Sequence, residues 1–406
     1  MVLVFWLAVA VVAYVYAGYA IVLYAALCIR GRRASRDRAE AGPPSISGVS
    51  IVIAARNEAA RLAARIENLL RLDFPAGMRE IIVVSDGSTD DTLDVLARYG
   101  DAVDAIAVPA GGKALALNAG VARARFDIVA FADARQAFAP DALRELVAPF
   151  ADPRVGAVTG ELRLDAESPC RRKAGDRRAL DRRRAERLGA RDRRIDDRRR
   201  TVRSTIADGV GLYWRYEKLL RRLESAIDST LGATGAIYAM RRTLWRPLPA
   251  EAILDDVLAP MRCVLTGHRI TFNDRARARD RAAATAREEA RRKVRTAAGN
   301  WQILFLEPRL LLPWRNPVWL QYVSHKVGRL LVPFALAAAI ASNVALAGQS
   351  ALYAMTLIAQ CALYLLASYG ARLDHRVARI AYAFLMMNAS AVSGLMALAF
   401  RRKVWR

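Results

Sequence analysis

The chain has 406 residues, of which 54% are hydrophobic, and a formal net charge of +24 at pH 7. This length suits one catalytic domain with accessory segments. The apolar residues exceed the share of a typical globular protein and gather at the two ends of the chain. The four cysteines, at positions 28, 170, 263 and 361, are widely spaced, so neither a disulfide framework nor a zinc site is indicated.

Much of the positive charge lies in one segment of Asp-Arg-Arg and Arg-Arg-Arg repeats. Between Arg171 and Arg203 there are sixteen Lys or Arg against six Asp or Glu, and no aromatic residue. A nucleic-acid-binding face usually interleaves aromatic with basic side chains, so we expect no nucleic acid as a partner. We interpret residues 170–204 as a solvated insertion. Attraction to anionic lipid beside a cytoplasmic membrane face is the alternative.

The first apolar segment predicts a transmembrane helix. Residues 1–29 contain no charged side chain and are long enough to cross a bilayer. A cleaved signal peptide is the alternative, but the segment lacks a basic n-region and exceeds the usual apolar length. A basic linker, residues 30–48, follows directly. The positive-inside rule therefore predicts an external amino terminus and a cytoplasmic domain after the linker.

Three further apolar segments predict three spans between residues 330 and 400: Leu330–Leu346, Ala351–Tyr369 and Ile380–Phe400. The basic loop before the last of them fits the cytoplasmic side. Three spans place the basic tail, residues 401–406, outside, against the same rule. Either one segment is re-entrant or these charges are tolerated. We expect a multi-pass protein of the cell's inner (plasma) membrane.

The segment between these ends alternates short apolar runs with amphipathic ones, which predicts an α/β doubly wound domain. The expected elements in chain order are a strand at Val49–Ile53, a helix opened by Ala54–Glu58, a strand at Glu80–Val84, a helix at Thr92–Tyr99, a strand near Ala105–Val108, a helix after Gly111, and a strand at Ile128–Phe131.

Acidic residues stand where the predicted strands end. Asp86 and Asp133 each follow an apolar strand. Ligands of open α/β sheets bind at the carboxyl ends of the strands, and carboxylates there can hold a divalent metal with a nucleotide diphosphate. Asp133 and residues 88–91 could instead cap the helices that follow. Lys113, after two glycines, can reach a diphosphate oxygen as a point charge.

A third acidic motif is the adjacent pair Asp255-Asp256, which follows an apolar triplet. Two neighbouring carboxylates repel each other, and this repulsion can raise one pKa toward that of a general base.

Together, these motifs resemble the family 2 glycosyltransferases of the GT-A fold. The similar branch is membrane-embedded and includes cellulose, chitin, hyaluronan and poly-N-acetylglucosamine synthases. The resemblance covers Val49 to about Gln302 and implies a GT-A domain at 49–300, with a Rossmann-like, doubly wound mixed sheet. It also implies inverting transfer of a hexosyl or N-acetylhexosaminyl group from a UDP-sugar, with Mg²⁺ or Mn²⁺ as cofactor.

The resemblance assigns roles to the matching positions. Those at the nucleotide-sugar side are Arg56, Asn57, Glu58 and Asp86 for the uridine end, and Lys113 and Arg295 for the phosphates. Asp133 is the metal ligand. Asp256 is the catalytic base, with Asp255 beside it, and Gly232, Thr234 and Gly235 belong to the acceptor side.

Some positions depart from the family's motifs. Arg135 stands where a second metal carboxylate is usual, so either Asp133 and water hold the metal or Arg135 replaces part of its charge. Leu254 and Asp255 replace the Thr and Glu before the base. Arg292 and Thr296 replace the Gln and Trp that flank Arg295, which favours a non-processive product.

Tryptophans and basic residues between 301 and 329 predict helices that lie on the cytoplasmic leaflet. The relevant tryptophans are Trp301, Trp314 and Trp319. A buried connecting helix is the alternative interpretation.

The leading functional hypothesis is a membrane β-glycosyltransferase that builds or decorates an exopolysaccharide. A glycosyltransferase acting on polyprenyl phosphate or a glycolipid is the second hypothesis, and a membrane-anchored binding or regulatory protein with a degenerate transferase domain is the third. The expected partners are a UDP-sugar donor, a glycan or lipid acceptor and the lipid bilayer. If the product is a secreted polysaccharide, we also expect export subunits as partners.

Overall fold

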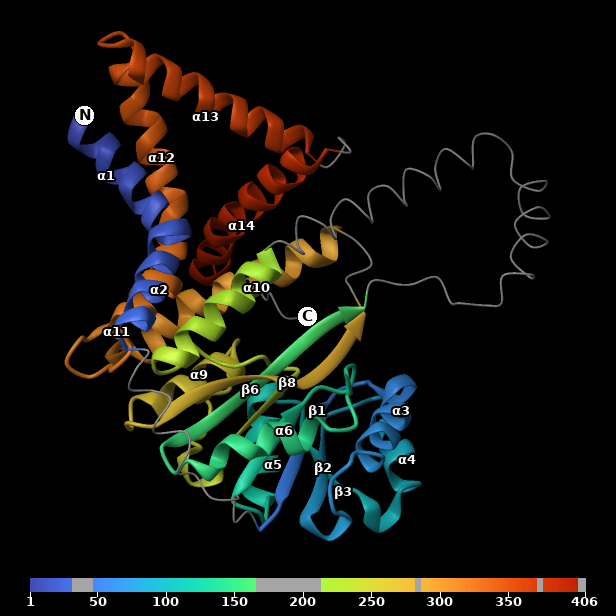
Figure 1. Cartoon of the computed structure of the whole chain (residues 1–406). Helices are drawn as coiled ribbons and strands as arrows, with labels where there is room; N and C mark the ends of the chain where they lie inside the picture. The colour runs from blue at the N-terminus through green and yellow to red at the C-terminus, as the bar shows by residue number, and fades with distance from the viewer. Residues whose placement is uncertain (31–46, 166–212, 282–285, 371–374, 401–406) are drawn as a thin grey trace, which may run out of the picture.

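The computed structural model describes residues 1–30, 47–165, 213–281, 286–370 and 375–400 (Figure 1). A sheet flanked by helices forms one part of the molecule, and long helices from both ends of the chain form the other (Figure 1). The Arg-rich insertion predicted at 170–204, most of the basic linker and the basic tail lie outside the described residues.

In the described part of the domain, one mixed sheet has eight strands in the order β3-β2-β1-β4-β7-β6-β8-β5. The strands β3, β2, β1 and β4 pair in parallel, and β7 is antiparallel to both of its neighbours. Their bounds are β1 Val49–Ala55, β2 Arg79–Asp86, β3 Asp104–Val108, β4 Ile128–Ala132, β5 Ala137–Phe138, β6 Val155–Asp165, β7 Ile237–Arg241 and β8 Arg269–Arg281. The predicted doubly wound mixed sheet is thus confirmed.

Helices bury both faces of the sheet, which explains why the first parallel strands are almost continuously apolar. One core layer lies between the sheet and the helices α3 (Ala59–Leu70), α4 (Thr92–Ala97) and α6 (Ala142–Val147). The other lies beneath α5 (Lys113–Arg123) and α9 (Asp255–Val264). Lys113 and Asp255 therefore begin helices on the same face of the sheet.

Three predicted element boundaries near the site were wrong. The strand β1 continues to Ala55, and the helix expected from Ala54 begins only at Ala59. The physical reason is Asn57, whose φ of 55° lies in the left-handed region and cannot continue either element. The strand β2 likewise runs on to Asp86, so this carboxylate ends the strand itself.

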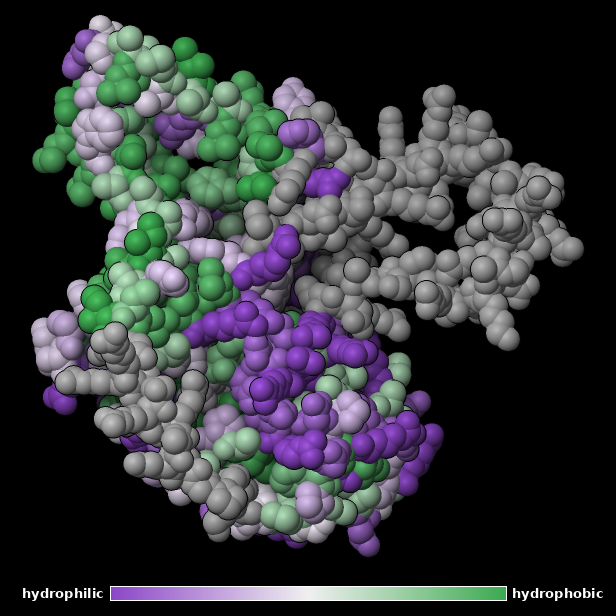
Figure 2. Space-filling model, viewed as in Figure 1, coloured by the Kyte–Doolittle hydropathy of each residue, from purple (hydrophilic) through white to green (hydrophobic). Residues whose placement is uncertain are grey.

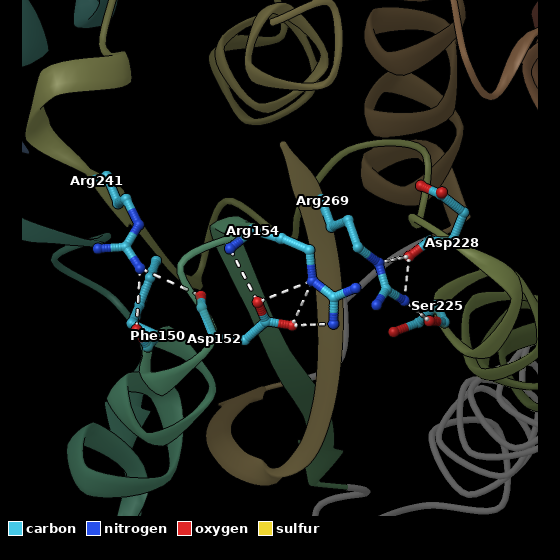
Figure 3. A network of polar contacts seen from close by, with 7 residues as sticks. All are labelled: Phe150, Asp152, Arg154, Ser225, Asp228, Arg241 and Arg269. Atoms are coloured by element: carbon cyan, nitrogen blue, oxygen red, sulfur yellow. Dashed lines mark hydrogen bonds and ion pairs between the residues drawn. The ribbon is translucent and has the colours of Figure 1, made fainter. Parts of the chain in front are cut away.

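The second half of the sheet was not predicted. The strand β8 carries Arg at 275, 277 and 279 and pairs in parallel with β6. Arginine side chains at the end of β7 and at the start of β8 hydrogen-bond to neighbouring segments (Figure 3). Arg241 donates to the carbonyl oxygens of Phe150 and Asp152, and Arg269 donates to those of Ser225 and Asp228. The last two carbonyls end helix 213–227, so Arg269 fixes this helix against β8.

Within the described residues, four helices are long and apolar enough to cross a membrane: Val2–Ile29, Trp319–Leu346, Ala351–Tyr369 and Val377–Ala399. Each overlaps one of the apolar segments predicted from the sequence, and the second begins before the predicted Leu330. Figure 2 shows hydrophobic side chains covering these helices and hydrophilic ones over much of the sheet domain. The first span comprises α1 (Val2–Ala13), a π-helix (Tyr14–Gly18) and α2 (Tyr19–Arg30). The other three contain α12 (Gly328–Leu346), α13 (Ala351–Tyr369) and α14 (Arg376–Ala399).

The helix α10 (Ala286–Leu306) joins the two parts of the molecule. It runs across the boundary predicted at residue 300 and packs against α14, where the indole N–H of Trp301 donates to the carbonyl of Ala391 at 3.0 Å. After α10 come a 3-10 turn (Pro308–Leu311), α11 (Trp319–Gln321) and the π-helix η7 (Tyr322–Val327). Trp314 is 75% exposed, whereas Trp301 lies within helix packing.

Candidate active site

Asp86 joins two loops at the carboxyl edge of the parallel strands. Its side chain is buried and accepts hydrogen bonds from the backbone N–H groups of Gly111 at 2.6 Å and Gly112 at 3.0 Å. Gly112 has a φ of 93°, a conformation that favours glycine. Arg56 Nη1 lies 3.8 Å from the Asp86 carboxylate and is more exposed. The structure therefore brings these two predicted uridine-side residues together.

Asn57 and Glu58 lie at the same edge, Asn57 bonded through its side chain and Glu58 through its backbone. Asn57 Oδ1 accepts from the N–H of Thr89 at 2.8 Å, and the N–H of Glu58 donates to Thr92 Oγ1 at 3.0 Å. Asp90 accepts from the N–H groups of Thr92 and Ala59, each at 3.1 Å. Asp90 thus joins the starts of α3 and α4 from the position before the N-cap of α4, Asp91, whose own side chain makes no cap bond.

Lys113 stands between two predicted site carboxylates. Its Nζ lies 3.1 Å from Asp133 Oδ1, at the end of β4, and 3.2 Å from Asp255 Oδ2, at the start of α9. The Asp255 side chain is 7% exposed and that of Asp133 is 35% exposed. Of the two carboxylates, Asp133 is thus the one open to a ligand.

Asp256 lies against the segment predicted for the acceptor side. Its Oδ2 accepts from the N–H of Gly235 at 2.8 Å, and its carbonyl accepts from the N–H of Ala233 at 2.7 Å. A side chain at position 235 would place its Cβ 3.0 Å from Asp256 Oδ2, so this close approach favours glycine. Thr234 is buried and bonds through its N–H to Thr159 Oγ1, while Gly232 faces Val257.

The charges of this cluster shift two pKa values. Burial, and then the adjacent Asp255, raise the pKa of Asp256 to about 6, while Lys113 opposes the shift. For Lys113, burial acts to lower the pKa, but the carboxylates of Asp133, Asp255 and Asp256 outweigh it and raise the value. The ammonium therefore stays charged, while Asp256 can exchange a proton near neutral pH.

Arg135 points to a different partner. Its Nη2 lies 2.6 Å from Asp280 on β8, whose side chain is 1% exposed. Within the part of the chain that the structure describes, no three His, Cys, Asp or Glu side chains are arranged to hold a metal ion by themselves. A divalent ion at Asp133 would need further oxygen ligands from a bound diphosphate and water, which is a donor set that Mg²⁺ accepts.

Arg295 is the predicted site residue that the structure does not bring to the cluster. It is exposed on α10, and among the described residues no ion pair or hydrogen bond connects it to Asp133, Asp255 or Asp256.

Three residues near the cluster were not singled out from the sequence. Tyr238 on β7 is fully buried, its ring stacks on Phe131 at 4.5 Å, and its hydroxyl lies within the electrostatic field of the three aspartates. Arg221 on helix 213–227 donates a hydrogen bond to Thr234 Oγ1. Lys326 in η7 follows His325, whose Nδ1 lies 2.6 Å from Glu224 Oε1 on the same helix. Tyr238 lies inside the glycine-rich acceptor segment, which could have drawn attention to it, but no local motif marks the two cations.

Comparison with known families decides the class of the protein. The family described as glycosyltransferase like family 2 matches residues 44–299, which contain all the site residues above except Lys326. The chain belongs to this family. It is accordingly an enzyme of the glycosyltransferase class, and the resemblance predicted from the motifs is confirmed.

Curated relatives align with part of the chain. A beta-monoglucosyldiacylglycerol synthase from Nostoc sp. is 37% identical over 120 residues, which are 28% of this chain and 26% of the relative. A poly-beta-1,6-N-acetyl-D-glucosamine synthase from Staphylococcus aureus is 33% identical over 127 residues, 30% of each chain. The chain thus spans less than a third of the length of these relatives.

Among solved structures, the mannosyltransferase PcManGT from Pyrobaculum calidifontis, in complex with GDP-Man and Mn²⁺, is similar over 98% of this chain and 100% of its own. The TM-score is 0.64 and the sequence identity is 20%. This similarity supports the GT-A fold and includes the long apolar helices.

Proposed function

We propose that this glycosyltransferase transfers a sugar from a UDP-sugar to an acceptor hydroxyl at the cytoplasmic membrane face, with inversion at the anomeric carbon. The observation that carries the proposal is the arrangement around Lys113. Its ammonium forms ion pairs with Asp133 and Asp255, while Asp256 is hydrogen-bonded to the glycine-rich segment. A partly exposed carboxylate for a metal and a buried one for a proton are what this reaction requires.

The donor would lie along the carboxyl edge of the parallel strands. Arg56 and Asp86 would contact the uridine, and Lys113 the diphosphate. A divalent ion, Mg²⁺ or Mn²⁺, would be held by Asp133 and would neutralise charge on the leaving diphosphate. The Mn²⁺ and GDP-Man of the mannosyltransferase structure support this class of donor and cofactor.

Asp256 would act as the general base. Its carboxylate accepts the proton of the acceptor hydroxyl while that oxygen forms a bond to the anomeric carbon and the bond from this carbon to the diphosphate oxygen breaks. Attack from the side opposite to the leaving group converts an α-linked donor into a β-glycoside. The electrons of the broken bond leave with the diphosphate, close to Lys113.

The four apolar helices support a place in the membrane, and the basic residues after the first span support a cytoplasmic active site. The names of the relatives support two acceptor classes, a growing glycan and a glycolipid. The replacement of the Gln and Trp around Arg295 favours a single transfer over processive extension.

Release of UDP from the detergent-solubilised full chain tests the proposal. We expect release from at least one UDP-sugar with Mg²⁺ or Mn²⁺, its loss on addition of EDTA, and its return with excess metal. The anomeric configuration of the product is read by NMR. If no nucleotide sugar is consumed, the transferase hypothesis is rejected in favour of a degenerate regulatory protein. A product that retains the α-linkage would exclude inversion.

A further inference from the structure

The helix α9, which carries the proposed base, begins without a side-chain cap of its own. Its N-cap is Leu254, whose side chain accepts no hydrogen bond, and residues 245–254 before it contain no helix or strand. The direction in which α9 leaves this segment determines where Asp255 and Asp256 point. Because an uncapped helix start does not fix that direction by itself, contacts from elsewhere in the chain must hold the segment.

Gln302 of α10 holds this segment with both ends of its side-chain amide. Its Oε1 accepts from the backbone N–H of Ile253 at 3.0 Å, and its Nε2 donates to the carbonyl of Glu251 at 2.8 Å. Gln302 is only 8% exposed, so water competes little for either bond. One side chain thus bonds the backbone on both sides of Ala252, just before Asp255.

The helix α10 also contacts the start of α9 directly, one turn before Gln302. A Cβ at Gly299 would lie 2.4 Å from Cγ of Leu254 and 2.8 Å from its Cδ1. This close approach favours glycine, since a larger residue would push α10 away from Leu254. Ala298 and Ile303 of α10 are buried in the same core layer as Leu254. The position of α10 therefore determines where α9 starts.

A second side of α10 packs on the membrane helix α14 (Figure 1). The indole N–H of Trp301 donates to the carbonyl of Ala391. A Cβ at Gly394 would lie 2.6 Å from the backbone nitrogen of Ala298 and 2.8 Å from Cβ of Ala297. The two helices approach so closely here that no side chain fits at position 394. A displacement of α14 would consequently move α10.

We propose that Gln302 is a positioning residue for the transfer reaction, and that α10 links the placement of Asp255 and Asp256 to the membrane helix α14. The inference rests on the proposed function for the role of Asp256. A general base must lie within hydrogen-bond reach of the acceptor hydroxyl, and a misplacement of about 1 Å can cost about 10²-fold in rate. The N–H of Gly235 holds the Asp256 side chain, and Gln302 holds the entry to its helix.

Gln302→Met tests the role of the amide, because methionine has a similar length but forms neither bond. In the detergent-solubilised full chain, we expect kcat for UDP release to fall about tenfold or more. The KM for the donor and the equilibrium binding of UDP should stay within about twofold. Amide hydrogen exchange of residues 251–258 should become faster, and this measurement reports the loss of support without requiring turnover.

Asn300→Leu is the matched control. Asn300 lies on the same helix, and its amide bonds within that helix, to the carbonyl of Thr296 at 2.9 Å. The variant should change neither kcat nor the exchange of residues 251–258. Gln302→Asn keeps the amide on a side chain that is one methylene shorter, so it cannot reach both backbone groups. It should also lower kcat, and it replaces Gln302→Met if thermal unfolding shows that the latter does not fold.

Gly394→Ala tests the link to the membrane helix. The added methyl group has no room against α10, so it should displace α14, lower kcat about threefold or more and keep UDP binding. Gly348→Ala is the matched control, since no heavy atom of the described residues lies within 4 Å of a Cβ there. This variant should leave kcat unchanged.

Three results would overturn the inference: a kcat in Gln302→Met close to that of the unmodified enzyme, an equal loss in Asn300→Leu, or a loss of UDP binding that accompanies the loss of kcat. An unchanged kcat in Gly394→Ala would reject the link to α14. If the unmodified chain releases no UDP, the proposed function fails by itself. The exchange measurement then still decides whether Gln302 holds the segment, and unchanged exchange in Gln302→Met would reject that support.

Discussion

The donor edge and the membrane-facing side of the site are built in different ways. At the donor edge, Asp86, Lys113 and Asp133 follow one another along the chain, and each stands where a strand ends or a helix begins. At the membrane-facing side, Asp256 accepts from the N–H of Gly235, and Thr234 accepts from Arg221 of helix 213–227, which is bonded to the first membrane helix through Tyr216. The residues proposed for the donor are thus placed by elements close in the chain, and those proposed for the acceptor by packing between distant segments.

If this division is correct, substitutions at the two sides should change different kinetic parameters. Those at the donor edge should alter nucleotide binding, and those at the membrane-facing side should alter acceptor binding. Asp256 lies where the two sides meet and should affect the chemical step.

The largest effect is expected for Asp256→Asn. The amide keeps the shape but cannot accept the proton, and loss of a general base lowers kcat by about 10²- to 10⁴-fold. UDP binding should persist. Rates of UDP release and equilibrium binding of UDP are the measurements, with Asp91→Asn, at an exposed helix cap without a side-chain cap bond, as the control. A kcat close to that of the unmodified enzyme would show that Asp256 is not the general base.

Lys113→Met should produce the next largest effect. The change removes the ammonium between Asp133 and Asp255 and leaves their charges uncompensated. Since a hydrogen bond to a charged group contributes about 1.5–3 kcal/mol, we expect the KM for the donor to rise roughly 10- to 100-fold.

Arg123→Met is the control for this prediction. Arg123 ends the same helix and pairs with Asp104 at the surface, where an ion pair contributes little. If Lys113→Met raised the KM for the acceptor and left that for the donor unchanged, the division between the two sides would be wrong.

Arg269→Met tests the membrane-facing side indirectly, because Arg269 holds the end of helix 213–227. Loss of the bonds to Ser225 and Asp228 should lower the melting temperature, by about 2–4 °C for each kcal/mol in a domain of this size. It should also weaken acceptor binding while donor binding is kept. Arg71→Met, at an exposed pair with Glu67, is the control and should change neither quantity. An unchanged acceptor KM would show that helix 213–227 needs no such anchor.

The smallest effect concerns pH. Asp256 must be ionised to accept a proton, so with a pKa of about 6 the rate should rise as the pH increases through this value. Because the charge of Asp255 contributes to the raised pKa, Asp255→Asn should move the rise to lower pH. The pH profile of kcat at saturating donor measures both. A shift to higher pH in the variant would contradict the stated interaction.

The sequence allowed good prediction of the parallel half of the sheet. Apolar strands followed by Asp86 and Asp133 are local patterns, and their helices and turns lie close by in the chain. The strand β8 was missed because Arg275, Arg277 and Arg279 make the segment polar on average. The residues between them, Ala276 and Ala278, are buried and give the alternation of a strand. Arg295 was assigned from its motif, yet its place depends on how α10 packs against the membrane helices.

The amino-acid sequence by itself determined the class of the protein: four apolar segments long enough for a membrane, a doubly wound domain between them, and the order of its acidic residues. Periodicity, length and residue type carry this information, because they depend on neighbours in the chain. Only the tertiary structure decided that Lys113 lies between two carboxylates, that Arg135 pairs with Asp280, and that Arg221 bonds to Thr234. Contacts between residues so distant in sequence leave no local pattern, because packing alone brings them together.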